Sequence, residues 1–111
     1  MKHSKCELSD YMLTRIIQTG LPEPVAEYQF DRLHNRKWRF DHAWVAQKIA
    51  CEYNGATWVG GRHVTGVGYE RDRVKMNAAV LQGWRVFEFT TSMIHSDQAI
   101  ETLVKAFEGL A

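Results

Sequence analysis

Three short strand candidates follow one another closely in the first half of the chain, and this spacing limits the fold more than any other feature. They cover residues 26–30, 38–45 and 48–53, with a basic turn around His34 between the first two. Such short connections favour antiparallel pairing, because parallel strands need a crossover of a dozen or more residues. The sequence therefore predicts an antiparallel three-stranded unit.

Successive side chains of a strand point to opposite faces of a sheet. In the second candidate this alternation predicts one aromatic-rich face, made of Trp38, Phe40, His42 and Trp44. The other face carries Arg39, Asp41, Ala43 and Val45. In the third candidate, Glu52 is expected on one face with Ala50 and Asn54, while Ile49, Cys51 and Tyr53 take the other.

Helical patterns and one more strand complete the chain. Residues 4–19 show helical spacing of apolar side chains after a capping box, and a glycine-rich loop spans 55–68. A helix over 69–82, a strand over 84–89 and a last helix opening near Ser96 or Asp97 follow. The helix between the third and fourth strands favours a parallel crossover. The predicted fold class is α/β, α-β-β-β-α-β-α, with a central mixed sheet flanked by helices.

Composition is typical of an ordered globular protein, with 45% hydrophobic and 12% aromatic residues in 111. This length predicts one domain over residues 1–111. No apolar run is long enough to span a bilayer, and the N-terminal residues are too polar for a signal peptide. Cys6 and Cys51 match no metal spacing, which favours free thiols in a reducing cytoplasm.

Positive charge is concentrated in the middle of the chain. Residues 32–85 hold ten Lys/Arg and four Asp/Glu, whereas the net charge of the whole chain is only +1. A basic centre indicates a polyanionic partner, although an ordinary solvated surface explains the charge distribution equally well.

Two carboxylates fall on the second and third strand candidates. Glu52 ends an apolar strand, and Asp41 lies among the aromatic residues of the strand before it. Burying a carboxylate costs several kcal/mol without a partner, and two that converge repel each other unless a cation or proton lies between them. Mg²⁺ is one such cation, since it prefers oxygen ligands. Ion pairs of Asp41 with Arg39 or Lys48, and of Glu52 with another cation, are the open alternative.

Around these carboxylates the sequence resembles the PD-(D/E)XK nuclease core, in which an Asp on one strand precedes Glu-x-Lys on the next. The resemblance rests on Arg39-Phe40-Asp41-His42-Ala43-Trp44 and Ile49-Ala50-Cys51-Glu52-Tyr53-Asn54-Gly55. More narrowly, residues 20–90 resemble small phage-type endonucleases related to very-short-patch repair enzymes. The segments that carry this likeness are 20–24, 27–30, 37–44, 60–63, Asp72-x-x-Lys75-x-Asn77 and 83–86.

The resemblance implies that Asp41, Glu52 and the backbone carbonyl of Tyr53 bind Mg²⁺, with Mn²⁺ as a substitute, to hydrolyse DNA phosphodiesters. The chain departs from the pattern at Asn54, which stands where the family has its lysine and can orient a water but not supply a positive charge. Lys75 replaces that lysine if its side chain reaches Glu52; an exposed Asp72–Lys75 ion pair is the alternative.

Further residues are candidates for secondary roles in DNA binding or cleavage. Glu27 is a candidate for a second ion or a water, or else a surface acid near Arg39, and His63 for phosphate contact or proton transfer. Phosphate contacts are expected from Arg36, Lys37, Arg62, Arg71 and Arg73, and base stacking from Trp58. The enzyme would nick or cut branched DNA, or cut both strands as a homodimer, in a bacterial or phage-infected cell. A DNA-binding or assembly module that has lost activity is the non-enzymatic alternative.

Overall fold

The computed structural model describes residues 5–54, 58–59, 62–63 and 66–110. Its elements, in chain order, are α1 (Lys5–Gln18), β1 (Val25–Gln29), the 3₁₀ helix η1 (Arg32–His34), β2 (Arg39–Trp44), β3 (Ile49–Asn54), β4 (Trp58–Val59), β5 (Arg62–His63), α2 (Val67–Leu81), β6 (Arg85–Thr90), α3 (Thr91–His95) and α4 (Gln98–Glu108). The predicted α/β fold is confirmed. None of the helices in the described part of the chain is long and apolar enough to cross a membrane.

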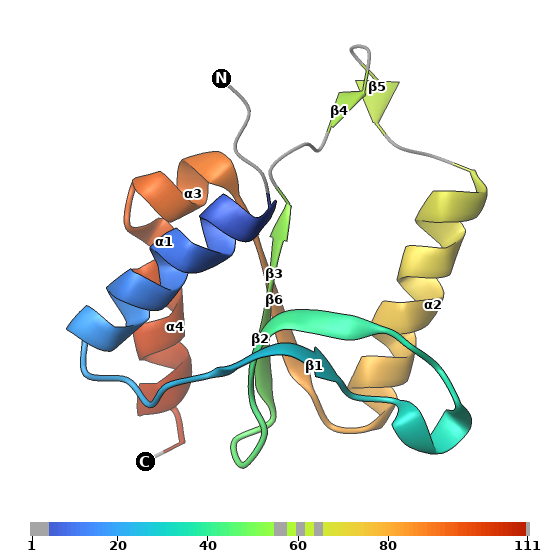
Figure 1. Cartoon of the computed structure of the whole chain (residues 1–111), viewed down its shortest axis with the longest axis horizontal. Helices are drawn as coiled ribbons and strands as arrows, with labels where there is room; N and C mark the ends of the chain where they lie inside the picture. The colour runs from blue at the N-terminus through green and yellow to red at the C-terminus, as the bar shows by residue number, and fades with distance from the viewer. Residues whose placement is uncertain (1–4, 55–57, 60–61, 64–65, 111) are drawn as a thin grey trace.

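Four strands form one mixed sheet in the order β1-β2-β3-β6. The first three pair in antiparallel fashion, and β6 runs parallel to β3, as the crossover through α2 predicts. Figure 1 shows the sheet between two layers, with α1, α3 and α4 on one side and α2 on the other. The sheet therefore has two covered faces, and each one has its own core.

The larger core lies on the side of α1, α3 and α4. It joins sheet residues to the helices and includes Leu8, Met12, Ile16, Trp44, Ile49, Cys51, Tyr53, Phe89, Ile100 and Leu103. The smaller core, on the side of α2, is aromatic and consists of Phe30, Phe40, Ala43, Ala50, Ala79 and Trp84. In α4, the buried residues are Ala99, Ile100, Leu103 and Ala106.

The prediction that Trp38, Phe40, His42 and Trp44 share one face is wrong. Trp44 belongs to the larger core, whereas Phe40 lies in the smaller one with Ala43. The β1–β2 register is the same on both sides of Glu27, but Glu27 itself has a φ of +53°. We attribute the change of face to this local conformation, which breaks the regular pleat of the strand pair opposite Asp41.

Two short features were not expected from the sequence. Helix α3 begins after Thr90, whose side chain accepts a hydrogen bond from the backbone N–H of Met93. The interval 55–68, predicted as an unstructured loop, includes the antiparallel pair β4–β5. Both elements are too short for hydrophobic periodicity to reveal them.

Asp31 fixes the turn between β1 and β2. Its carboxylate is buried, with Oδ1 2.6 Å from His34 Nδ1 and 2.8 Å from the amide nitrogen of Gln82, at the end of α2. The guanidinium of Arg36 lies 3.8 Å from the other carboxylate oxygen. The hydrogen bond from His34 is the main reason that the pKa of Asp31 is lowered, and the bond from Gln82 adds to it, whereas burial opposes it.

We expect Asp31→Asn to lower the thermal stability of the protein near neutral pH. A lowered pKa means that the ionised carboxylate stabilises the fold above the unfolded-state pKa of about 4, and that this contribution is lost as pH falls through the folded-state pKa. Thermal melts at about pH 7 and about pH 3 should therefore show a gap between wild type and variant that narrows in acid. Equal melting temperatures at neutral pH would contradict this, and Glu108→Gln, at an exposed acid of α4, is the control.

Candidate functional site

Asp41 and Glu52 lie on the neighbouring strands β2 and β3, and their exposed fractions are only 4% and 6%. The backbone N–H of Tyr53 donates to Asp41 Oδ2 at 2.7 Å. This bond ties the carboxylate of β2 to the end of β3. Two acids with so little solvent contact need compensating groups around them.

Lys75 provides one such group from α2. Its ammonium contacts Glu52 Oε1 and donates to the backbone carbonyl of Arg39 at 2.7 Å. Asp72 pairs instead with its neighbour Arg73. The structure thus brings Lys75 to Glu52, although Lys75 is distant in sequence from the strand that carries the lysine in the PD-(D/E)XK pattern. The contact equally matches the sequence alternative in which a cation pairs with Glu52.

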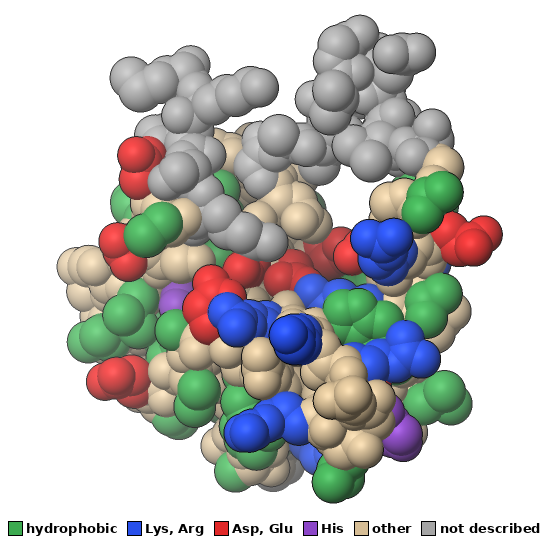
Figure 2. Space-filling view, turned by 45° about the vertical axis from the view of Figure 1, so that its right-hand side comes forward, with side chains coloured by type: hydrophobic (Ala, Val, Ile, Leu, Met, Phe, Trp, Pro, Cys, Tyr) green, Lys and Arg blue, Asp and Glu red, His purple; other side chains and the backbone are tan. Residues whose placement is uncertain are grey.

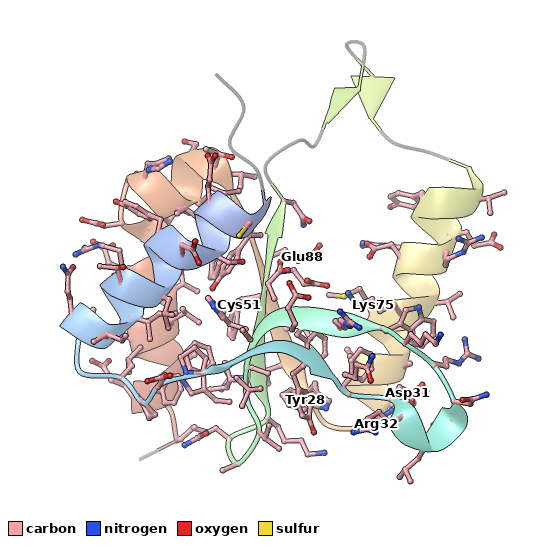
Figure 3. The ribbon with its side chains drawn as sticks, viewed as in Figure 1. Tyr28, Asp31, Arg32, Cys51, Lys75 and Glu88 are labelled. Atoms are coloured by element: carbon pink, nitrogen blue, oxygen red, sulfur yellow. The ribbon has the colours of Figure 1, made fainter. Side chains whose placement is uncertain are left out.

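Glu88 is a neighbouring acid that sequence reasoning missed. It is the register partner of Glu52 in the parallel β3–β6 pair, and its Oε1 accepts a hydrogen bond from Asn54 Nδ2 at 3.1 Å. In Figure 3, Glu88 and Lys75 both lie in the region between the sheet and α2, whereas Cys51 is on the other side of the sheet. The signal was available, because an acid that interrupts the apolar run of β6 resembles Glu52 in β3.

Acidic side chains gather near the centre of the face shown in Figure 2, with basic side chains beside and below them. Of the predicted phosphate-contacting residues, Arg36, Lys37 and Arg71 are exposed. Arg73 is partly exposed and lies over the ring of Tyr69, 5.1 Å from its centroid. The predictions for Arg62, His63 and Trp58 concern side chains that lie outside the described part of the structure.

Glu27 is exposed on the edge strand β1, where it lines an open hollow of about 510 Å³. Tyr28, Arg32 and Arg39 line the same hollow. This places Glu27 beside Arg39, as expected for a surface acid. Its role as an ion or water ligand stays a prediction.

A buried polar pair lies behind Asp41, on the opposite face of the sheet. His42 Nδ1 and the Tyr53 hydroxyl are 2.7 Å apart, which links β2 to β3. Burial lowers the pKa of His42, partly opposed by the charge of Asp41, so the neutral ring is favoured. Burial also raises the pKa of Tyr53 and Cys51, which keeps both groups protonated.

The donor chemistry of Asp41 and Glu52 fits a hard divalent cation. Mg²⁺ takes oxygen ligands and often needs only one or two protein carboxylates. Among the residues that the structure describes, no group of three or more His, Cys, Asp or Glu side chains is arranged to hold a metal ion. The candidate ligands are therefore the two carboxylates and the backbone carbonyl of Tyr53, whose amide already faces Asp41.

Comparison with known proteins supports the fold. No protein-family model and no curated protein matches the sequence. The structure is similar to the catalytic domain of homing endonuclease I-Bth0305I, with a TM-score of 0.64, 14% sequence identity, and coverage of 90% of this chain and 91% of that chain. At this identity the likeness shows a shared fold. The chain thus shares the fold of that catalytic domain.

Tyr53→Phe is expected to destabilise the protein by about 1–3 kcal/mol, because it removes a hydrogen-bond partner from the buried ring of His42. Urea unfolding followed by tryptophan fluorescence measures the change. Tyr69→Phe makes the same chemical change on an exposed side chain and should have little effect. A Tyr53→Phe variant as stable as wild type would show that this pair does not hold β2 and β3 together.

Proposed function

We propose that the protein is a Mg²⁺-dependent DNA endonuclease whose reaction centre is formed by Asp41, Glu52 and Lys75. The observation that carries the proposal is the contact of Lys75 with Glu52, beside a second buried carboxylate. Two acids and one lysine are the side chains that the PD-(D/E)XK pattern uses. The fold shared with a homing endonuclease catalytic domain supports the same class of reaction.

In this proposal the carboxylates of Asp41 and Glu52 hold the ion, together with the carbonyl of Tyr53. In an extended strand the N–H and C=O of one residue face the same neighbour, so this carbonyl lies at the edge that faces Asp41. When bound, Mg²⁺ supplies positive charge that stabilises the charge developing on the phosphate and acidifies the attacking water. Mn²⁺ is expected to substitute.

Lys75 takes the place of the motif lysine. Its ammonium has three donors and no acceptor, and the structure accounts for one donor with Glu52 and one with the Arg39 carbonyl. The third can orient a water or a phosphate oxygen. Asn54, at the motif position, holds the carboxylate of Glu88 through its amide and so acts as a positioning residue.

DNA is the proposed substrate because basic side chains surround the acidic centre. Arg36, Lys37 and Arg71 are exposed and Arg73 is partly so; together with Arg62 they are the proposed phosphate contacts. A chain acting alone has one reaction centre and nicks one strand, whereas cutting both strands in one binding event requires a homodimer.

A second candidate function is a nuclease-fold module that binds DNA without cutting it. The same ion pair favours it, since Lys75 already neutralises Glu52 as a structural cation would. The two functions differ in whether a divalent ion binds. In the enzyme, Mg²⁺ raises the melting temperature through Asp41 and Glu52, whereas in the module it does not.

Plasmid and branched DNA incubated with Mg²⁺, Mn²⁺ or EDTA test the enzyme directly. We expect cleavage with either metal, none with EDTA, none for Asp41→Ala, and a loss of about 10²–10³-fold for Lys75→Met. Glu101→Ala, at an exposed acid of α4, should cleave like wild type.

Thermal melts of the same variants with and without Mg²⁺ separate the two functions. A wild type that cuts nothing and gains no stability from Mg²⁺ would exclude the enzyme and leave the DNA-binding module. Cleavage by Asp41→Ala at the wild-type rate would place the reaction centre elsewhere.

A further inference from the structure

The turn between β1 and β2 carries an unusual side chain at its tip. Leu33, in η1, is 98% exposed, the highest value among the exposed large hydrophobic residues of the described chain. Single exposed leucines are common and need no explanation by themselves. This one has basic neighbours in the same turn, namely Arg32, Arg36 and Lys37, all of them exposed.

Hydrogen bonds and ion pairs of Asp31 hold the turn in one conformation. Buried Asp31 takes contacts from three side chains of the turn and of α2, and its backbone carbonyl accepts the N–H groups of His34 and Arg36, both at 3.2 Å. Asn35 closes the turn in a left-handed conformation, with φ +57°. A tip fixed in this way loses little conformational entropy when it meets a partner.

The surface beside Leu33 carries basic side chains that suit the phosphate backbone of DNA. Arg32, next to Leu33, lines the hollow of about 510 Å³ along β1 with Arg39 and Tyr28. Figure 3 labels Arg32 and Tyr28. The carbonyl of Arg39 accepts the hydrogen bond from Lys75. The hollow and the proposed reaction centre therefore share one residue, Arg39.

We propose that Leu33 is an apolar wedge that enters between base pairs of duplex DNA, while Arg32, Arg36 and Lys37 contact the flanking phosphates. This inference rests on the proposed function, since it assumes that DNA is the ligand. Proteins that kink DNA use leucine and similar side chains in this way, offsetting the cost of unstacking by the contacts that the bent duplex allows. Deformable steps, mismatches and branched junctions are then preferred, because they unstack at lower cost.

Short duplexes with 2-aminopurine at successive steps test the wedge, because the fluorescence of this base rises when it is unstacked. Binding is followed in parallel by anisotropy, in EDTA so that nothing is cut. We expect wild type to raise the fluorescence of at least one duplex at saturation, Leu33→Ala to bind without the rise, and Leu33→Phe to restore it.

Two controls separate unstacking from binding. Leu110→Ala truncates another exposed leucine, near the C-terminus, and should behave like wild type. Lys37→Ala should weaken binding and reduce its dependence on salt, yet keep the full rise at saturating protein.

The outcomes also separate this inference from the function on which it rests. Wild-type binding with no rise in any duplex, or an equal rise with Leu33→Ala, overturns the wedge and leaves DNA binding intact. Absence of any binding by wild type overturns the DNA ligand and the wedge with it. If the Leu33→Ala change instead weakens binding to vesicles of anionic phospholipid and leaves DNA unaffected, the turn is a membrane contact and the wedge is wrong.

Discussion

The contact between Lys75 and Glu52 governs both the electrostatics and the architecture of the molecule. Two buried carboxylates need compensation, and Lys75 provides it for Glu52 from outside the sheet, while the backbone N–H of Tyr53 donates to Asp41. Helix α2 depends on the contact in turn, because Ala79 is its one buried residue and Val74, Val80 and Leu81 are exposed. Polar contacts therefore help to hold α2 against the rest of the fold. They are made by Lys75 to Glu52 and by Gln82, just beyond the end of the helix, to Asp31.

The parts of this arrangement that could be predicted from sequence are those set by local pattern. Strand spacing predicted the antiparallel pairing of the first three strands, and the intervening helix predicted the crossover to the fourth. An acid at the end of an apolar strand indicated Glu52. The missed features depend on contacts between distant segments. Glu88 becomes a neighbour of Glu52 only through the parallel register, and the proximity of Lys75 depends on how α2 crosses over the sheet. We attribute the unexpected face of Phe40 to the backbone conformation of Glu27 in β1, and the residue pattern of β2 gives no sign of that conformation.

Strand β2 connects the proposed reaction centre to the basic turn. The turn leads into Trp38, which stacks against Arg36 with the guanidinium carbon 4.5 Å from the ring centroid. Arg39 follows and gives its carbonyl to Lys75, and Asp41 comes two residues later. The irregular position of Glu27 lies opposite Asp41, where the strand changes face. Irregularities of this kind often re-aim side chains beside functional sites, and here the irregularity accompanies a buried acid and a buried aromatic on one side of the sheet.

In the proposed function, charge balance allows one lysine to pair with Glu52 both with and without a bound metal ion. Asp41 and Glu52 are two acids to the one cation Lys75, and Glu88 lies beside Glu52, so acidic groups outnumber the lysine here. A divalent ion would offset this excess of acidic groups and would also attract a phosphodiester. The proposed centre then attracts a phosphate only with the metal bound, whereas the basic side chains of the turn carry their charge with or without it.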